Sequence, residues 1–530
     1  MRPAGAQGRP LAELAGLLGV VLAARDQPAG RDPLRGPGGP LMVSGVTHDS
    51  RRVRPGDLYA ALPGGHHHGA DFCQDAARAG AVAVLTDAVG RAAARRCGLP
   101  VFVVADPRAR LGEVADWVYR HPSGSLLLIG VTGTSGKTTT TYLLETGLRR
   151  AGHLTGLAGG VETRVGDLTT ASHLTTPEAT DLQALFAVMA SRGVTAAAME
   201  VSSHALALGR VAGTAYDVAI FTNLSQDHLD FHGSLDDYFA AKATLFTPAY
   251  TRVGVVNTDD AYGRRLAEDT QIPVTTFSAA GDPAADWRAT DVRTGADGST
   301  FRIVGPGGVE ADASVALPGR YNVANALGAV VALVEAGVHL ATAVAGVAAC
   351  PGVPGRLERV EAGQDFTVLV DYSHKPGAVE AVLGALRPVT GGRLCIVLGC
   401  GGDRDRAKRP LMGAASARLA DVAILTSDNP RSEDPLAILA EMLAGVLTVP
   451  EQERARVIIE PDRAAAIALA VAMAGKGDVV VVAGKGHERG QYVGSSVIPF
   501  DDREVAAAAI RHHLGQAPPG GEPLPWEAQP

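Results

Sequence analysis

Short apolar runs alternate with longer segments of helical character along most of the 530 residues. Two such runs are "SLLLIGV" (125–131) and "DVVVVAG" (478–484), which are long enough for a buried strand and far too short to span a membrane. The segments between the runs are rich in Ala and Leu. Strands that alternate with helices in this way predict an α/β fold with largely parallel sheets.

Turn-rich breaks divide this pattern into three segments. The stretch "YRHPSGS" closes a first segment, 1–123, and the Pro- and Gly-rich stretch "CPGVPGR" separates a second, 124–353, from a third, 354–515. Regular alternation of strands and helices in the third segment is typical of a doubly wound, Rossmann-like domain. The remaining residues, 516–530, are rich in Pro and Gly, and we expect a disordered tail there.

Composition and charge narrow the class of protein. A hydrophobic content of 46% with 20% charged residues is typical of a globular chain, and a net charge of −8 gives no basic footprint for nucleic acid. The five cysteines are odd in number and include no C-x-x-C pair, which argues against a disulfide framework and a structural zinc site. The N-terminus lacks the pattern of a signal peptide, so we expect a cytoplasmic protein.

A Gly-rich loop, "GTSGKT" (133–138), follows the first buried strand and precedes a helical segment that starts near Lys137. Backbone N–H groups of such a loop cradle phosphate, Lys137 would reach the β and γ phosphates, and Thr138 would bind Mg²⁺. The general P-loop pattern requires Gly at position 131, where this chain has Val131. We still predict ATP binding. The loop residues expected to take part are Gly133, Thr134, Ser135, Gly136, Lys137, Thr138 and Thr139.

Three further motifs follow the loop: "AMEVSSHALALGRV" (198–211), "IFTNLSQDHLDFHGSLDDYFAAKATLF" (220–246) and "LPGRYNVANAL" (317–327). Together with the loop they resemble the Mur ligase family, which also includes the folylpolyglutamate synthetases, over nearly the whole chain. The resemblance implies a uridine-nucleotide-binding α/β domain, a central P-loop ATPase domain and a C-terminal Rossmann-like domain. It also implies an ATP-dependent joining of a carboxylate to an amine through an acyl phosphate, with Asn325 and His374 on the ATP side.

The resemblance further implies a magnesium site. Thr138, Glu200 and His228 would bind Mg²⁺, together with Lys242 after its amine has been carbamylated by CO₂. A His with a Glu would ordinarily suggest zinc, but Mg²⁺ is favoured beside a phosphate loop. Other interpretations remain open at this point: a core histidine, a helix-capping glutamate and a lysine that reaches solvent along an apolar surface. The expected catalytic residues are Lys137, His228 and Lys242.

The stretch "VTHDSRRVRPGDLYAALPG" (46–64) is similar to the uridine domain of the branch that adds the third residue of the peptidoglycan stem peptide. Ser50, His66 and His67 would contact the UDP group. His68 stands where relatives usually have Asp, and Leu208 stands where many have Gln. A metal on the three consecutive histidines is disfavoured, because neighbouring side chains of an extended loop point to different sides. The expected contacts with the muramoyl-dipeptide are Thr175, Thr176, Ser202 and Arg210.

Four motifs of the third segment begin where predicted strands end: "DYSHKP", "GCGGDRDRAKRPLM", "SDNPR" and "AGKGHE". In a doubly wound sheet the carboxyl ends of the strands share one crevice, where ligands bind. By resemblance this crevice holds the incoming amino acid. The residues expected to bind it are Arg404, Asp428, Asn429, Pro430, Arg431, Gly484 and Glu488.

The chemistry of these side chains favours meso-diaminopimelate over lysine as that amino acid. A distal carboxylate suits a planar bidentate donor, which Arg431 with Arg404 would supply, while Glu488 would accept from the distal ammonium. Bound lysine would leave the arginine buried without a partner, a discrimination of roughly 2–4 kcal/mol. The resemblance therefore implies transfer of meso-diaminopimelate to UDP-N-acetylmuramoyl-L-alanyl-D-glutamate.

Three alternatives stay open from the sequence. A lysine-adding ligase of the same family is disfavoured by Arg431 and Arg404, and a folylpolyglutamate synthetase by the uridine-type N-terminal segment. A nucleotide-dependent switch protein would not need Thr175, Thr176 or Arg210. We expect a monomer that binds no nucleic acid, has no membrane span and closes its domains during the reaction, because ATP and the amine lie on different domains.

Overall fold

The structure is a computed structural model, and it describes residues 2–3, 8–20, 34–36 and 39–516. Apart from Gln516, the predicted disordered tail lies outside these residues. The chain forms two compact units. The first unit comprises Met1–Phe277, Ala284–Trp287 and Gly328–Gly346, and the second unit comprises the rest. The boundary predicted near residue 123 falls inside the first unit.

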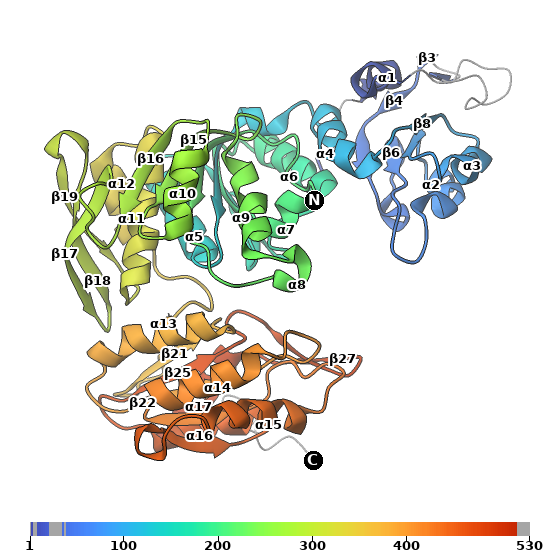
Figure 1. The fold of residues 1–530 in the computed structure, drawn as a ribbon. Helices are drawn as coiled ribbons and strands as arrows, with labels where there is room; N and C mark the ends of the chain where they lie inside the picture. The colour runs from blue at the N-terminus through green and yellow to red at the C-terminus, as the bar shows by residue number, and fades with distance from the viewer. Residues whose placement is uncertain (1, 4–7, 21–33, 37–38, 517–530) are drawn as a thin grey trace. The chain divides into compact units, whose positions relative to one another are not determined.

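The N-terminal part of the first unit is a small parallel sheet with helices around it (Figure 1). Its four strands lie in the order β5-β6-β7-β8 and are all parallel. The sheet is formed by β5 (Gly45–Thr47), β6 (Asp57–Ala60), β7 (Ala83–Thr86) and β8 (Val101–Val103). The helices of this part are α1 (Leu11–Leu18), α2 (Cys73–Arg78), α3 (Arg91–Ala94) and α4 (Pro107–Val118), and β1 (Arg9–Pro10) pairs with β4 (Met42–Val43).

A larger sheet forms the middle of the first unit. Six of its strands are parallel, in the order β10-β13-β9-β14-β15-β16, and β11 and β12 extend it with antiparallel pairing. The strands are β9 (Leu127–Thr132), β10 (Thr155–Ala158), β11 (Glu162–Val165), β12 (Leu168–Ala171), β13 (Ala196–Glu200), β14 (Tyr216–Phe221), β15 (Thr251–Asn257) and β16 (Val274–Ser278). The central strands are largely buried, and β9 and β13 carry polar side chains only at their carboxyl ends, Thr132 and Glu200, as expected for a parallel sheet.

Helices cover this sheet and join it to the N-terminal part. Helix α4 packs on α6, and the two helices contribute buried side chains, such as Leu111 and Ala184, to one shared core. The contact between α4 and α6 therefore connects the N-terminal part to the central part within the first unit. The helices of the central part are α5 (Lys137–Arg150), α6 (Ala179–Ser191), α7 (Ser203–Ala207), α8 (Leu229–His232), α9 (Leu235–Ala243), α10 (Ala261–Asp269), α11 (Arg320–Glu335) and α12 (Leu340–Ala348).

The second unit contains an antiparallel meander and a doubly wound sheet. The meander is β17 (Trp287–Gly295), β18 (Gly298–Val304) and β19 (Glu310–Val315). The sheet has the order β20-β21-β25-β22-β23-β24, in which only β20 is antiparallel. Its strands are β20 (Glu358–Arg359), β21 (Thr367–Asp371), β22 (Leu394–Leu398), β23 (Val422–Leu425), β24 (Arg456–Ile459) and β25 (Val479–Ala483). The predicted α/β class with mostly parallel sheets is confirmed.

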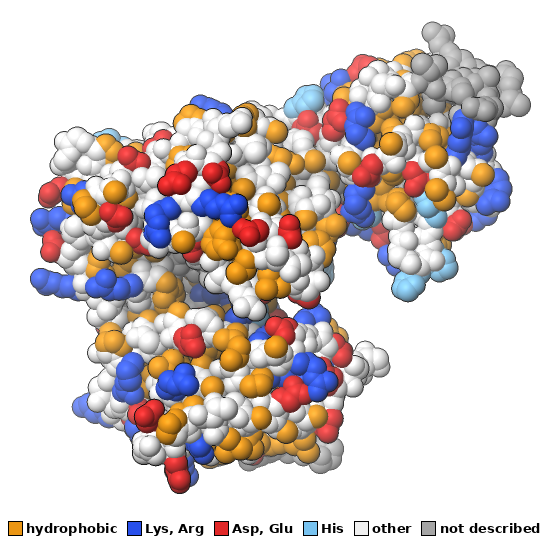
Figure 2. All heavy atoms as spheres, viewed as in Figure 1, with side chains coloured by type: hydrophobic (Ala, Val, Ile, Leu, Met, Phe, Trp, Pro, Cys, Tyr) orange, Lys and Arg blue, Asp and Glu red, His pale blue; other side chains and the backbone are white. Residues whose placement is uncertain are grey.

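Helices lie on both faces of this second sheet (Figure 1). One apolar core contains side chains of α13 (Pro376–Leu386), α14 (Lys408–Leu419) and α15 (Pro435–Val446), and another contains those of α16 (Arg463–Met473) and α17 (Asp502–His513). A hairpin of β26 (Gly490–Val493) and β27 (Ser496–Pro499) follows β25. On the face seen in Figure 2, basic and acidic side chains are interspersed. Within the described ranges, no helix has both the length and the apolar character needed to span a membrane.

Candidate functional site

The predicted phosphate loop joins β9 to α5. Strand β9 ends at Thr132, and α5 begins at Lys137, as predicted. Gly133 and Gly136 both have positive φ, +145° and +87°. A Cβ on Gly133 would lie 1.9 Å from Thr222 Oγ1, so only glycine fits the backbone at this position. The loop thus has the backbone shape that presents N–H groups at the start of a helix.

Residues that follow β14 hold the loop in place. The backbone N–H of Thr134 donates to the carbonyl oxygen of Asn223 (2.9 Å), and that of Ser135 donates to Asn223 Oδ1 (3.0 Å). Thr222 Oγ1 donates to the carbonyl oxygen of Ser135 (2.7 Å). Thr139, the remaining predicted loop residue, is buried in the first turn of α5. The loop is therefore preformed by hydrogen bonds that the protein itself supplies.

Two lysines meet at one carbonyl group of the loop. Lys137 Nζ and Lys242 Nζ each donate to the carbonyl oxygen of Gly133 at 2.8 Å. Lys242 is 1% exposed, and its ammonium lies 4.6 Å from the ring centre of Tyr238. The interpretation of Lys242 as a lysine that reaches solvent is therefore wrong. Two cations this close together create a position suited to a phosphate or carboxylate anion.

Glu200 lies at the carboxyl end of β13, next to the loop. It pairs with Val131 of β9, and its Oε1 accepts from Thr138 Oγ1 (3.0 Å) and from the backbone N–H of Gly160 (2.8 Å). The alternative of a helix-capping glutamate does not apply, because Glu200 is the last residue of a strand. The hydroxyl and the carboxylate are hard oxygen donors, the kind of ligand that Mg²⁺ prefers. These two residues therefore fit a magnesium ion beside the phosphates.

His228 has different partners. It precedes α8 with φ +53°, its side chain is 44% exposed, and its Nε2 lies 3.0 Å from Asp227 Oδ2. The ring of His204 packs edge-on against it at 4.6 Å, and burial together with the charges of His228 and His232 lowers the pKa of His204 to about 4. A core histidine is therefore excluded for His228. Among the described residues, no group of three or more His, Cys, Asp or Glu side chains is arranged to hold a metal ion.

Thr176 and Ser202 border the same strand end. Thr176 Oγ1 donates to the carbonyl oxygen of Glu200 (2.9 Å) and accepts from the backbone N–H of Ser202 (3.0 Å). Ser202 caps α7, because its Oγ accepts from the backbone N–H of Ala205 (3.2 Å). The structure thus brings two predicted dipeptide contacts together with the candidate metal ligand Glu200. The Thr-Thr-Pro stretch does more than cap a helix, because Thr176 Oγ1 donates to the carbonyl oxygen of Glu200 at the end of β13.

The other predicted dipeptide contacts lie nearby. Thr175 lies beside Gly160, since a Cβ on that glycine would be 3.3 Å from Thr175 Oγ1. Arg210 Nε lies 2.8 Å from Glu178 Oε1, and Arg108 Nη1 lies 3.6 Å from the other oxygen of that carboxylate. Leu208 ends α7 and is half-buried.

In the N-terminal part, Ser50 begins a short 3₁₀ turn, Ser50–Arg52, and His66 and His67 are exposed on the loop after β6. His68, the departure from the usual Asp, caps the next turn as an Asp would. Its Nδ1 accepts from the backbone N–H of Ala70 (3.0 Å), and its Nε2 lies 3.1 Å from Asp87 Oδ1. His68 thus caps this turn, and Asp87 orients its imidazole.

The second unit brings the four strand-end motifs to one edge of its sheet. In the parallel register, Ala483 at the end of β25 pairs with both Asp371 and Leu398, and Leu398 pairs with Leu425. The four strands therefore end in one row, and the loops that follow them are neighbours. The predicted convergence of these motifs is confirmed at the level of the sheet.

Arg431 reaches across this edge to the loop that follows β22. Its Nη1 donates to the carbonyl oxygen of Gly402 (2.6 Å). A Cβ on Gly401 would lie 3.0 Å from Arg431 Nη1 and 3.8 Å from Arg404 Cγ, so both arginines border this glycine. Arg404 is exposed and donates to the carbonyl oxygen of Asp403 (3.0 Å). The structure thus places both arginine side chains beside the loop that follows β22.

The backbone of Arg431 is held by the β26–β27 hairpin. Its N–H donates to the carbonyl oxygen of Tyr492 (2.9 Å), and its carbonyl oxygen accepts from the N–H of Gly494 (2.7 Å). The residue has φ +52°, an uncommon conformation for a residue with a side chain. Pro430 precedes Arg431 in this turn. Because Tyr492 and Gly494 hold the backbone of Arg431, the direction of its side chain depends on contacts far away in the sequence.

Asn429 and Glu488 are also in direct contact. Asn429 is buried, and its Nδ2 donates to Glu488 Oε2 (2.9 Å). Asp428 is buried as well, and burial raises the pKa of its carboxyl group. Gly484, with φ +113°, allows the close approach of Asp428, whose Oδ2 would lie 2.5 Å from a Cβ at that position. This edge of the sheet thus has both kinds of group that an amino acid needs. Arg404, Arg431 and Asn429 supply N–H donors, and Glu488 supplies a carboxylate acceptor.

The two residues predicted on the ATP side outside the loop are placed as follows. His374 follows β21, its Nδ1 lies 2.7 Å from the carbonyl oxygen of Tyr372, and burial with the nearby charges of Lys375 and Lys408 lowers its pKa to about 3. The imidazole is therefore neutral at physiological pH, and its low pKa makes it a weak proton acceptor and so a poor general base. Asn325 lies in α11, where its Nδ2 donates to Asn322 Oδ1 (3.1 Å).

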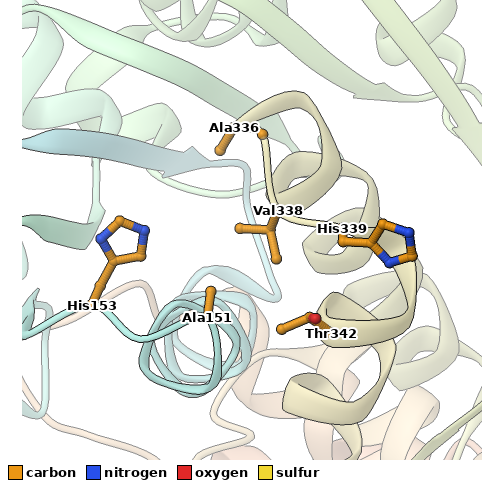
Figure 3. Close-up of a pocket in the computed structure, with 7 residues that line it drawn as sticks. Ala151, His153, Ala336, Val338, His339 and Thr342 are labelled. Atoms are coloured by element: carbon orange, nitrogen blue, oxygen red, sulfur yellow. The ribbon is translucent and has the colours of Figure 1, made fainter.

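A small hollow lies at the opposite end of α5 from the phosphate loop (Figure 3). Ala151, His153, Val338, His339 and Thr342 are among its lining residues. Because α5 has 14 residues, this hollow is roughly 20 Å from the loop along the helix axis. It contains none of the predicted site residues and is no part of the candidate site.

Some residues that shape the site were not predicted from the sequence. Lys485 contacts Asn429, and Arg409 is buried between Glu433 and Glu441, which lie 2.7 and 3.0 Å away. Lys485 lies inside the quoted motif "AGKGHE", which could have drawn attention to it. Nothing in the local pattern around Arg409 indicates a buried arginine.

Comparisons with known proteins agree with this geometry. Three family models match the chain: the Mur ligase family catalytic domain at 42–119, the Mur ligase middle domain at 131–333 and the Mur ligase glutamate ligase domain at 355–486. The matched ranges lie inside the three predicted segments, whose outer boundaries remain a prediction.

Similar proteins are known along the full length. UDP-N-acetylmuramoyl-L-alanyl-D-glutamate–2,6-diaminopimelate ligases of Streptomyces avermitilis and Streptomyces coelicolor are each 59% identical over 514 residues, covering 97% of this chain and 99% of theirs. A solved structure of a ligase with that name is 33% identical, with a TM-score of 0.65, over 93% of this chain and 99% of the other. On these matches, the chain belongs to the Mur ligase family.

Proposed function

We propose that this protein is an ATP-dependent ligase that adds meso-2,6-diaminopimelate to UDP-N-acetylmuramoyl-L-alanyl-D-glutamate in peptidoglycan precursor synthesis. The γ-carboxylate oxygen of the glutamate attacks the γ-phosphorus of ATP, and ADP leaves. The amine of diaminopimelate then attacks the acyl carbon, loses its proton and expels phosphate. The products are the UDP-N-acetylmuramoyl-tripeptide, ADP and phosphate.

One observation carries the choice of amino acid: Arg431, Asn429 and Glu488 lie together at the carboxyl edge of the second sheet. Arg431 with Arg404 would bind the distal carboxylate, and Glu488 would accept from the distal ammonium. Lysine has the ammonium and lacks the carboxylate. The names of the two Streptomyces relatives support the same choice.

The phosphate loop would bind ATP through its backbone N–H groups. Lys137, whose Nζ lies at the carbonyl group of Gly133, would face the negative charge that develops during phosphoryl transfer. Thr138 and Glu200 would hold Mg²⁺ with His228 as a further ligand, and the ion would neutralise charge on the transferring phosphate. We also propose carbamylation of Lys242, which would convert a buried cation into an anionic metal ligand.

The other substrate would bind along the first unit. Thr175, Thr176, Ser202 and Arg210 would hold the dipeptide near Glu200. The glutamate carboxylate of the dipeptide would then lie beside the phosphate loop. Ser50 with His66 and His67 would contact the uridine nucleotide in the N-terminal part. We further propose that the enzyme acts as a monomer in the cytoplasm.

The decisive experiment measures phosphate release by the wild-type protein with ATP, Mg²⁺ and UDP-N-acetylmuramoyl-L-alanyl-D-glutamate. We expect release that depends on diaminopimelate, with lysine at least about 30-fold less effective, as a lost charged contact implies. Equal rates with both amines would overturn the proposed selectivity. Phosphate release without any dependence on an amine would instead favour a nucleotide switch.

A further inference from the structure

Lys485 is a fully buried lysine in the loop that follows β25. Its side chain is 0% exposed. Lysines are almost never fully buried unless they are paired, because the ammonium loses its hydration. The proposed reaction assigns this residue no role, so its position needs another explanation.

The ammonium of Lys485 has three oxygen neighbours. It donates to Asn429 Oδ1 (2.9 Å) and to the carbonyl oxygen of Gly490 (2.6 Å), and it lies 3.4 Å from Glu488 Oε2. An ammonium has three N–H donors and no acceptor, so each N–H has an oxygen to face. Two of the three oxygens belong to residues that would bind the amino acid.

These contacts fix the orientation of the Asn429 amide. The oxygen of that amide receives Lys485 Nζ and the backbone N–H of Tyr492 (3.1 Å), both of which can only donate. The amide nitrogen must therefore be the end that meets Glu488 Oε2. With the amide turned round, Lys485 and Tyr492 would both face an NH₂ group, and Glu488 would lose its donor.

Glu488 is positioned from the same side. Its Oε2 receives both Asn429 Nδ2 and Lys485 Nζ, while its side chain remains 31% exposed. One edge of the carboxylate is thus held by the protein, and the exposed part can receive a ligand. Removing Lys485 would free Asn429 to rotate and Glu488 to move.

We propose that Lys485 is a positioning residue for amine selectivity: it acts through Asn429 and Glu488, and contacts no substrate itself. This inference rests on the proposed function, because it assigns the amino acid to the same edge of the sheet. A purely structural role is the competing explanation, since the bond to Gly490 also anchors the start of the β26–β27 hairpin. The two explanations differ in which kinetic constants change.

The test compares Lys485→Met with Lys476→Met, a change at an exposed lysine of the second unit. Phosphate release by each full-length variant is measured with diaminopimelate and with lysine at saturating ATP and UDP-N-acetylmuramoyl-L-alanyl-D-glutamate. The KM for ATP is measured separately, by varying ATP at saturating concentrations of the other substrates. For Lys485→Met we expect the KM for diaminopimelate to rise about 10- to 100-fold, with the KM for ATP unchanged. The preference for diaminopimelate over lysine should fall by a similar factor. Lys476→Met should match the wild type.

A double variant tests whether Lys485 acts through Asn429. If it does, the KM for diaminopimelate of the double variant Lys485→Met with Asn429→Ala should be within about threefold of that of Asn429→Ala alone. The second change adds little because Lys485 has lost the residue through which it acts. Lys485→Arg, which keeps the charge, should restore part of the affinity. If Lys485→Met does not fold, the same criteria apply to Lys485→Gln, which keeps the ability to donate and lacks the charge.

Two results would overturn the inference. One is an unchanged KM for diaminopimelate in a folded Lys485 variant, and the other is a double variant whose losses multiply. Failure of the proposed function has a different signature, because the wild-type protein would then show no release that depends on diaminopimelate.

Discussion

The hydroxyl group of Thr138 donates to Oε1 of Glu200 at 3.0 Å, and this bond joins the first turn of α5 to the end of β13. Thr138 belongs to the phosphate loop region, and Glu200 lies 62 residues further along the chain. The same carboxylate oxygen accepts from the N–H of Gly160. The candidate metal ligands are thus oriented by each other and by the backbone.

Glu200→Gln should therefore remove activity without unfolding the protein. The glutamine oxygen can still accept from Thr138 and Gly160, but the negative charge that would hold Mg²⁺ is lost. We expect kcat for phosphate release to fall about 10²- to 10³-fold, with an unchanged melting temperature. Steady-state kinetics and thermal unfolding measure the two quantities.

Glu145→Gln provides the matched control for that change. Glu145 is a buried glutamate within α5 that accepts from Thr155 Oγ1 at 2.6 Å and pairs with Arg149 and Arg164. We expect a lower melting temperature with nearly normal kcat. If both variants lost kcat to the same degree, Glu200 would have no special role.

Lys242→Ala tests the proposed carbamate. The variant should lose at least about 10²-fold in kcat, because it removes a charge-bearing group at the phosphate loop. If Lys242 is naturally carbamylated, added formate or acetate should supply a carboxylate in the vacated space. The kcat of the variant should then rise about tenfold. Lys137→Ala, which removes the neighbouring cation, should not respond to these acids. Absence of rescue in Lys242→Ala would contradict carbamylation.

Arg431→Lys should change which amine is accepted. Lysine at this position keeps a positive charge but cannot form the planar two-bond contact with a carboxylate. We expect kcat/KM for diaminopimelate to fall about 30- to 1,000-fold, which corresponds to roughly 2–4 kcal/mol. The value for lysine as substrate should change by less than about threefold. Arg406→Lys, at an exposed arginine of the neighbouring loop, is the control and should have little effect.

The ion pair between Arg463 and Asp502 should be important for stability. Both side chains are 0% exposed, the atoms Nη2 and Oδ2 lie 2.6 Å apart, and Arg463 also donates to the carbonyl oxygen of Ala483 at the end of β25. Arg463→Met leaves a buried carboxylate without its partner, so the free energy of unfolding in urea should fall by about 3–5 kcal/mol. Arg387→Met, which breaks an exposed pair with Asp421, should cost less than about 1 kcal/mol. Equal costs for the two variants would contradict this prediction.

His374 should make the stability depend on pH. Its pKa in the folded protein is lowered from 6.5 to about 3 by burial and by the charges of Lys375, Lys408 and Arg356. Below about pH 6 the unfolded chain binds a proton at this histidine and the folded chain does not, so stability is lost as pH falls. The wild type should lose about 1 kcal/mol per pH unit relative to His374→Gln between pH 6 and 4.

Unfolding of both proteins across this pH range measures the effect, with His513→Gln, at an exposed histidine of the second unit, as the control. A constant difference between wild type and His374→Gln at all pH values would show that His374 is protonated equally in both states.

The sequence was sufficient to predict the phosphate loop and the strand-end motifs. Buried parallel strands have near-continuous apolar runs, so their ends can be located, and parallel strands place those ends at one edge. That is why the sequence was sufficient to assign Lys137 and Glu200 to the edge of one sheet and Arg431 to the edge of another. A helix was predicted to start near Lys137, and α5 begins at that residue.

Other features depend on contacts that no local pattern encodes. The burial of Lys242 against Gly133 and that of Arg409 between two glutamates arise only when distant elements pack. His68 replaces a capping Asp because an imidazole nitrogen can accept the same hydrogen bond, and its orientation depends on Asp87. The packing of His204 against His228 could not be predicted either, because His204 lies on a different helix, α7.

The backbone of Arg431 has a consequence for protein engineering. Its left-handed conformation is intrinsically unfavourable by roughly 1–2 kcal/mol for a residue with a side chain, and the β26–β27 hairpin holds it there through Tyr492 and Gly494. An arginine introduced at the equivalent turn of a lysine-adding relative should keep this direction only where a hairpin supplies the same two backbone hydrogen bonds. A change of amine preference between family members should therefore require exchange of two segments, the turn that carries Arg431 and the β26–β27 hairpin. Exchange of the single residue should yield enzymes that are poor with both amino acids.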